Sequence, residues 1–142
     1  MARLPEIVAD ASVVSKWFVP ETASDIAVLL RDGHAEGRLR LLAPSLMPYE
    51  VANALRYHPA MTSERLREAV RALFDLQVHL VRPSPELLEP AAAFALQEKL
   101  TLYDACYAVL ADRHSCPLVT EDSRLLRSST RAVSLSKWSL QR

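Results

Sequence analysis

Four carboxylate residues fall at corresponding places in the sequence, each where a predicted strand ends or a predicted helix begins. Asp10 follows the short apolar run IVA, and Asp122 follows the apolar stretch PLVT after one intervening residue. Glu50 and Asp104 lie in the first turns of two predicted helices. In a parallel sheet, the carboxyl ends of the strands and the N-termini of the following helices share one edge. We therefore expect the four carboxylates to converge there.

Carboxylates gathered at one place suit a divalent cation. Without a cation they repel one another, and some are pushed toward protonation. Oxygen-only ligands favour Mg²⁺ or Mn²⁺. A bound ion of this kind lowers the pKa of a water molecule and stabilises charge on a phosphoryl centre. The pattern therefore points to metal-assisted hydrolysis.

Each acid also has a purely structural interpretation. Asp10 and Asp122 are placed to cap the helical segments that follow them. Glu50 and Asp104 are placed to complement helix dipoles, an effect of only ~0.3–1 kcal/mol each. The functional interpretation therefore depends on the four residues together and not on any one of them.

Other chemistries lack the residues that they require. The only glycines, at positions 33 and 37, fit neither the G-x-x-x-x-G-K-[ST] phosphate loop nor the G-x-G-x-x-G dinucleotide motif. The chain has no G-x-S-x-G elbow. Neither Ser12 nor Ser15 has a histidine close to it in the sequence.

The composition is that of an ordinary globular domain. The chain has 142 residues, of which 50% are hydrophobic and 24% charged, and this length fits one domain with a real core. Its 17 basic and 17 acidic residues give zero net charge, which counts against a broad electrostatic grip on nucleic acid but allows a local basic rim. The apolar runs are too short for a membrane span or a signal peptide. A cytoplasmic protein is expected, with Cys106 and Cys116 as reduced, structural thiols.

Short apolar strands that alternate with amphipathic helices position these residues. The predicted strands are 7–9, 39–43, 77–81, 117–120 and 132–135. The first predicted helices are 11–18, 22–37 and a segment capped by Ser45 and broken at Pro59. The next two run from Thr62 or Ser63 through Phe74, and from Ser84 to about Leu100 with a kink at Pro90. The last two are Leu102–His114, capped by Thr101, and Ser123–Arg127. This alternation predicts an α/β fold with a parallel sheet and helices on both faces.

Four segments resemble a known family, in that family's order and across nearly the whole chain. They are IVADASVVSKWFVPE, PSLMPYEVANAL, LTLYDACYAVLA and LVTEDSRLL. They resemble PIN-domain ribonucleases, and closely the VapC-type toxin of a VapBC toxin–antitoxin system. The resemblance implies a single PIN-like nuclease domain over residues 1–142, folded as an α/β/α sandwich with a mainly parallel central sheet.

The resemblance also implies an activity and its partners. It implies a Mg²⁺- or Mn²⁺-dependent endoribonuclease that hydrolyses RNA phosphodiesters as the toxin of a type II pair. Such a toxin forms a homodimer and is blocked by a cognate antitoxin protein.

Carried over by position, the resemblance assigns an acidic quartet, both catalytic and metal-binding, made of Asp10, Glu50, Asp104 and Asp122. Asp10 and Asp104 are expected to be direct metal ligands, and the other two act directly or through water. Ser12 and Thr120 match polar positions beside the first and last acids, where hydroxyls hold waters or orient carboxylates from a second shell.

Further residues are assigned less directly. Lys16 and Arg124 closely follow acidic motifs and are candidates for contacts to RNA phosphates. Asn53 shares a helix face with Glu50 and fits a surface amide as well as a site residue. Glu121 is expected to face solvent. A set of aromatic residues could be core or could line a groove for an antitoxin peptide or a dimer face: Trp17, Phe18, Tyr49, Tyr57 and Phe74.

Two other functions fit the same sequence. A PIN nuclease of RNA maturation or repair would act without an antitoxin. A PIN-like scaffold would bind a protein partner without catalysis, and the intact acids count against it.

Overall fold

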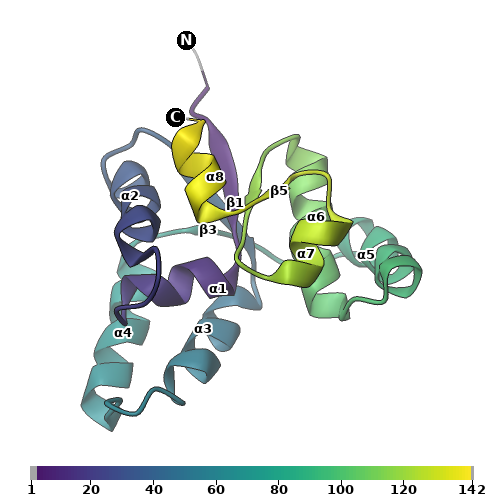
Figure 1. Cartoon of the computed structure of the whole chain (residues 1–142). Helices are drawn as coiled ribbons and strands as arrows, with labels where there is room; N and C mark the ends of the chain where they lie inside the picture. The colour runs from purple at the N-terminus through teal and green to yellow at the C-terminus, as the bar shows by residue number, and fades with distance from the viewer. Residues whose placement is uncertain (1–2, 142) are drawn as a thin grey trace.

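A single parallel sheet forms the centre of the molecule (Figure 1). The computed structural model describes residues 3–141, and within them five strands lie in the order β3-β2-β1-β4-β5. The strands are β1 (Glu6–Ala9), β2 (Arg40–Pro44), β3 (His79–Val81), β4 (Leu118–Val119) and β5 (Ala132–Val133). All neighbouring pairs of these strands are parallel, which confirms the expected α/β fold.

Helices cover both faces of the sheet (Figure 1). One layer contains α1 (Ala11–Val14), the 3₁₀ turn η1 (Ser15–Trp17), α2 (Ser24–Ala35), α3 (Met47–Leu55) and α4 (Ser63–Asp75). The other contains α5 (Pro85–Glu98), α6 (Leu102–His114) and α7 (Ser123–Ser128). The last helix, α8 (Leu135–Leu140), packs against α2. The expected α/β/α sandwich is thus confirmed, and no helix within residues 3–141 is long and apolar enough to cross a membrane.

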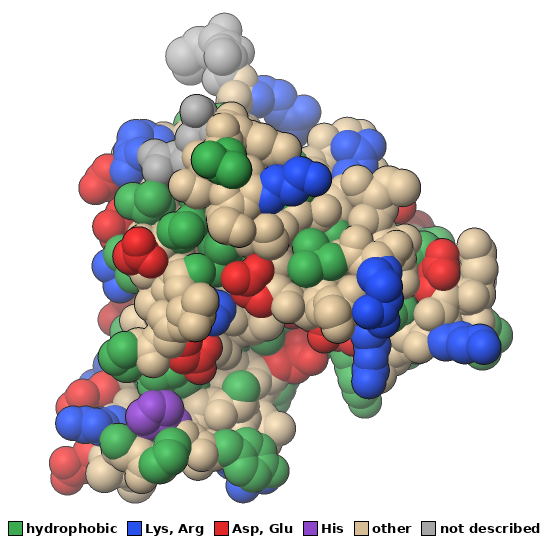
Figure 2. Space-filling model, viewed as in Figure 1, with side chains coloured by type: hydrophobic (Ala, Val, Ile, Leu, Met, Phe, Trp, Pro, Cys, Tyr) green, Lys and Arg blue, Asp and Glu red, His purple; other side chains and the backbone are tan. Residues whose placement is uncertain are grey.

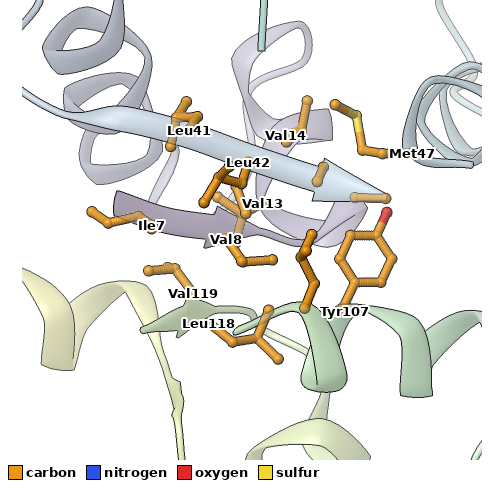
Figure 3. Close-up of a cluster of buried hydrophobic side chains, with 14 of the residues drawn as sticks. Ile7, Val8, Val13, Val14, Leu41, Leu42, Met47, Tyr107, Leu118 and Val119 are labelled. Carbon is orange, nitrogen blue, oxygen red and sulfur yellow. The ribbon is translucent and has the colours of Figure 1, made fainter. Parts of the chain in front are cut away.

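The core lies on both faces of the central strands. Figure 3 shows side chains from β1, β2 and β4 packed between the layers, among them Val8, Leu42 and Leu118, which are fully buried. A strand covered by helices on both faces needs apolar residues at every position and not at alternate ones. The continuous apolar runs of the sequence follow from this. Cys106 and Cys116 are buried free thiols.

The order of the strands reverses beside β1. The chain adds β2 and then β3 on one side of β1, and later adds β4 and β5 on the other side. At such a reversal the connections leave in opposite directions, and a crevice opens at the carboxyl ends of the two strands. Asp10 directly follows β1, and Thr120 directly follows β4. The fold therefore puts the first and last predicted motifs at the same crevice.

Three predicted helix caps are confirmed. Thr62, Ser84 and Thr101 each accept a hydrogen bond from the backbone N–H three residues on. Each replaces one of the hydrogen bonds that the first turn of a helix lacks. Pro90 lies within α5 and does not end it.

Two predicted helix starts are wrong. Thr22 does not begin α2, because residues 19–24 form a turn in which the Ser24 hydroxyl accepts from the Glu21 N–H and Ala23 adopts a left-handed conformation, φ 65°. Ser45 does not cap α3, because Leu46 holds the N-cap position, and the Ser45 N–H donates to the carbonyl of Val81, which continues the pairing of β2 with β3. The helix starts two residues later, at Met47.

The C-terminal segment also differs from the prediction. The expected strand 132–135 is shorter, and the chain turns into α8, which the sequence analysis did not predict. This helix is capped by Ser134, whose hydroxyl accepts from the Lys137 N–H. It buries Leu135 and Trp138, which explains why so short a helix is held in place.

Candidate active site

Asp10 is the most buried carboxylate of the crevice, with 6% of its surface exposed. Its Oδ2 accepts hydrogen bonds from the hydroxyls of Thr120, at 2.6 Å, and Ser12, at 3.0 Å. Burial raises the pKa of Asp10, because the charged form loses hydration, and the two hydroxyl donors oppose this rise. Asp10 stands at the N-cap position of α1, but its carboxylate is tied to the end of β4.

The two hydroxyls are themselves oriented by the backbone after β4. The N–H of Asp122 donates to Thr120 Oγ1 at 3.0 Å, and the N–H of Glu121 donates to Ser12 Oγ at 3.1 Å. Because each oxygen accepts from an N–H, its own proton is left to point at Asp10. Ser12 and Thr120 therefore fix the orientation of this carboxylate.

Asp122 caps the helix that follows it. Its Oδ1 accepts from the backbone N–H groups of Arg124 and Leu125, at 2.9 and 3.1 Å. Asp122 thus forms the predicted helix cap, and its charge also acts on the other acids of the crevice. It raises the pKa of Asp10 and of Asp104, in both cases as a smaller contribution than burial.

Asp104 enters the crevice from the first turn of α6. The turn is capped by Thr101, whose hydroxyl accepts from the Asp104 N–H at 3.0 Å. Asp104 is partly buried, and its pKa is raised by burial and then by the charges of Asp122 and Asp10. Asp104 and the two acids that follow β1 and β4 are therefore electrostatic neighbours.

Glu50 enters from the first turn of α3. Burial, together with the charges of Asp10 and Asp104, raises its pKa to about 7. A hydrogen bond from Tyr107 opposes the rise, with 2.7 Å between the phenol oxygen and Oε1 of Glu50. The structure thus brings all four predicted carboxylates into one electrostatic cluster, from four separate parts of the chain.

Tyr107 is a site residue that the sequence analysis missed. It is fully buried, and Figure 3 shows its ring in the core with the hydroxyl at the end of β2. It lies three residues after Asp104, so both side chains leave the same side of α6. That spacing was the available signal, but a tyrosine in an apolar helix is more simply explained as core.

The donor set suits a hard divalent cation. Four carboxylates supply only oxygen ligands, and three of them have raised pKa values because of burial and of one another. Within residues 3–141 no three His, Cys, Asp or Glu side chains stand together as a group able to hold an ion. The oxygen ligands and negative charge of the four acids therefore suit such an ion. The acids lie close enough for their charges to interact, but they do not form a closed ligand shell. Figure 2 shows acidic side chains where the surface is hollowed between α3 and α4 on one side and α6 and α7 on the other.

The two candidate RNA-contacting cations differ in their surroundings. The Lys16 side chain is 9% exposed, and its ammonium group is held by Glu21, at 3.2 Å, and by the carbonyl of Thr22, at 2.8 Å. Arg124 is exposed on α7, where its charge lowers the pKa of Asp104 as a minor contribution. Lys16 thus ties η1 to the following turn, whereas Arg124 stands at the rim of the crevice.

Glu121 does not simply face solvent, so that prediction is wrong. It is partly buried, and its Oε2 accepts from the Leu135 N–H at 3.3 Å, at the start of α8. The carboxylate is used there because the first N–H groups of a helix lack intrahelical partners. Glu121 therefore supports the C-terminal helix and leaves the crevice to Asp122.

The predicted aromatic set divides into core and surface. Trp17 is buried, and its indole N–H donates to the carbonyl of Ala27 at 2.8 Å. Phe18 is partly buried against the core. Tyr49, Tyr57 and Phe74 are exposed.

The chain is similar to a known protein family and to known proteins over most of its length. The model of the PIN domain family matches residues 7–129, a span that contains all four carboxylates. Ribonuclease VapC3 of Pyrobaculum aerophilum is 33% identical to the chain, over 84% of this chain and 92% of that protein. Ribonuclease VapC1 of Mycobacterium tuberculosis is 34% identical, over 86% of this chain and 90% of that protein.

Solved structures share the fold. The crystal structure of a protein from Pyrobaculum aerophilum superposes on this chain with a TM-score of 0.70 and 25% sequence identity. The match covers 96% of this chain and 94% of that protein's chain. A toxin–antitoxin complex from Klebsiella pneumoniae gives a TM-score of 0.68 at 15% identity, with 91% of this chain and 97% of that chain covered. The second likeness concerns the fold alone.

Proposed function

The chain belongs to the PIN domain family, and on that premise we propose that it is an endoribonuclease that cleaves RNA phosphodiester bonds at the crevice between β1 and β4. One observation carries the proposal: the buried Asp10 carboxylate is held by Thr120 and Ser12 within a cluster of acids from four parts of the chain. Keeping such acids together costs stability, because burial and mutual repulsion disfavour the charged forms. The relatives named as ribonucleases support RNA as the substrate.

The proposed cofactor is Mg²⁺ or Mn²⁺. Asp10 and Asp104 are the expected direct ligands, and Glu50 and Asp122 act directly or through water. When bound, such a cation would supply Lewis acidity, which would make a water molecule more acidic and would offset negative charge on a phosphoryl centre.

The chain's own residues prepare the site. Thr120 and Ser12 hold the Asp10 carboxylate in one orientation. Tyr107 holds Glu50 from the interior. Arg124 stands at the rim, where a guanidinium can fork onto a phosphate of the RNA backbone. Fixed side chains of this kind lower the cost of organising the reacting groups.

The proposed role of this activity is that of a toxin. Relatives carry the name VapC, and a structure of similar fold is titled a toxin–antitoxin complex. We further propose, as the family resemblance implies, that the protein acts in the cytoplasm as a homodimer restrained by a cognate antitoxin protein.

The test of the enzymatic proposal is cleavage of total RNA in Mg²⁺ or Mn²⁺, with cut sites mapped and EDTA as the metal-free control. Asp10→Asn keeps the shape of the side chain and removes its charge, so cleavage should fall by at least about 100-fold, the scale of losing one group that stabilises a transition state. Asp75→Asn, at an exposed position on α4, is the matched control and should cleave as the wild type does. An Asp10→Asn protein that cuts RNA at the wild-type rate would contradict the assignment.

A separate test addresses the toxin. Induced expression should arrest growth, and co-expression of a small DNA-binding protein encoded beside the gene, where the genome has one, should restore it. RNA cleavage in vitro without growth arrest would instead favour a nuclease of RNA maturation that acts without an antitoxin.

A further inference from the structure

A pocket with two exposed tyrosines adjoins the carboxylate cluster. It is lined by Leu46, Tyr49, Glu50, Asn53 and Tyr103. Tyr49 is 80% exposed and Tyr103 is 60% exposed. One wall of the pocket is Glu50, which belongs to the cluster, so the pocket and the candidate active site are continuous.

The two tyrosines are placed by the same elements as the acids. Tyr49 immediately precedes Glu50 at the start of α3, and Tyr103 immediately precedes Asp104 at the start of α6. The two first turns that deliver a carboxylate to the crevice therefore each present an aromatic ring beside it. Neither ring is needed by the core, since both lie mostly in solvent.

Asn53 supplies a polar group to the same pocket. Its Oδ1 accepts a hydrogen bond at 2.9 Å from Nε of Arg56, the residue that follows the C-terminal end of α3. The amide oxygen is thus partnered, and the two N–H donors of the amide are left to meet an acceptor in the pocket.

We propose that this pocket binds a single nucleobase of the RNA, stacked on Tyr49 or Tyr103 with its edge toward Asn53, beside the phosphodiester that is cut. This inference rests on the proposed endoribonuclease function and names the part of the substrate that the site holds. Unpaired bases are bound in this way by proteins that read single-stranded RNA, because every base has an aromatic face and hydrogen-bonding edges.

The position of the pocket favours a base over a protein side chain. Each RNA phosphate is joined through its ribose to a base, so a phosphate at the carboxylates brings a base to the neighbouring wall. Glu50 forms that wall, so a base can occupy the pocket while its phosphate stays at the carboxylates, whereas a protein segment there would exclude the RNA and act only as an inhibitor. The base requirement makes unpaired or loop nucleotides the expected cleavage sites.

The experiment measures base stacking directly, in the Asp10→Asn background so that the probe stays intact. The probe is a hexaribonucleotide with 2-aminopurine at its centre, whose fluorescence falls when the base stacks on an aromatic ring. Tyr49→Ala and Tyr103→Ala remove the rings, while Tyr49→Phe and Tyr103→Phe keep them. Phe74→Ala, which removes an exposed aromatic ring on α4 outside the pocket, is the matched control.

The expected result is quenching on binding, with affinity about 5- to 150-fold weaker in at least one of the two alanine variants, the range of one base–aromatic stack. The phenylalanine variants and Phe74→Ala should bind and quench as the parent does. Thermal unfolding of each variant verifies that the fold is intact, which is expected because both tyrosines are exposed.

Two outcomes would overturn the proposal. One is quenching and affinity equal to the parent in both alanine variants. The other is a change of mass by light scattering in those variants with unchanged quenching, which would assign the tyrosines to a contact between copies of the chain. Failure of the proposed function is a different result, because wild-type protein would then leave total RNA uncut in Mg²⁺ and Mn²⁺ whatever the probe shows.

Discussion

Tyr107 on α6 donates a hydrogen bond to Glu50 on α3, with 2.7 Å between the phenol oxygen and Oε1, although the two residues are 57 positions apart. The tyrosine is fully buried and the glutamate partly so. The bond thus joins the interior of one helix layer to the edge of the other. It also lowers the pKa of Glu50 against the dominant effect of burial, which raises it.

Tyr107→Phe should make the protein less stable at pH 8 than at pH 5, relative to wild type. The variant keeps the ring in the core but removes the donor to a carboxylate that is charged at the higher pH, and such a bond contributes about 1.5 kcal/mol. Urea unfolding at both pH values measures the difference. Tyr103→Phe, which removes a phenol hydroxyl from an exposed ring of the same helix, is the control. An equal loss at both pH values would mean that the phenol does not support the charged form.

The metal-free protein should lose stability as the pH rises from about 4.5 to about 7. Burial raises the pKa of Glu50 from 4.5 to about 7 in the folded chain, so the folded state binds the proton more tightly than the unfolded state does. The stabilisation is complete below the unfolded value and disappears as the pH passes the folded value. Urea titrations in EDTA across this range measure it.

Glu50→Gln is the control for that pH dependence, because the amide has the same shape and does not titrate. Its stability should change less between pH 4.5 and 7 than that of the wild type. A wild-type protein that gains more stability than Glu50→Gln over this range would show that the pKa of Glu50 is not raised.

Thr120→Val should destabilise the protein and impair the site together. The substitution keeps the shape but removes the donor to Asp10 and leaves the Asp122 N–H without its acceptor. Loss of these two hydrogen bonds costs about 1–3 kcal/mol, from about 0.5–1.5 kcal/mol for each bond. Thr130→Val, at an exposed position, controls for the loss of a hydroxyl and should be neutral. Denaturant unfolding and RNA cleavage provide the two measurements. Wild-type values in both would show that the Thr120 hydroxyl does not orient Asp10.

Replacement of Lys16 and replacement of Arg124 should have different effects, one on stability and the other on RNA binding. Arg124→Ala should weaken binding of an RNA oligonucleotide and reduce the slope of log affinity against log salt by about 0.7, as expected for one lost phosphate contact to a single strand. Lys16→Met should lower the unfolding midpoint, because its ammonium group holds Glu21 and the carbonyl of Thr22, and should leave that slope unchanged. A lower slope for Lys16→Met, with an unchanged slope for Arg124→Ala, would show that Lys16 and not Arg124 contacts the phosphate.

The parts of the fold that the sequence could predict were those encoded locally. Thr62, Ser84 and Thr101 are hydroxyl residues directly before helical periodicity, and each caps a helix as expected. The alternation of short apolar runs with helices predicted the parallel sheet. The meeting of the four acids followed from a general property of such sheets, namely that strand ends and the next helix starts share one edge.

The parts that it could not predict depend on contacts between distant segments. Ser45 was expected to cap a helix, but its N–H donates to the carbonyl of Val81 on the neighbouring strand, so Ser45 extends β2 and α3 begins only after Leu46. Glu121 was expected to face solvent, but it meets the start of α8, a helix whose short apolar pattern gave no signal. Tyr107 lies among residues 105–111 of α6, which are all buried. With no polar face, that stretch carries no periodicity that would set the tyrosine apart.

The hydrogen bond from Thr120 to Asp10 joins residues 110 positions apart. The carboxylate most deeply set in the crevice therefore acquires its partner only when β4, near the end of the chain, has paired with β1. A chain still emerging from the ribosome can already contain β1, β2 and β3 and still lack Thr120 and Asp122. The order of synthesis thus delays the completed site until nearly the whole polypeptide has been made, so a truncated product would carry Asp10 and Ser12 without Thr120, the second hydroxyl that orients the carboxylate.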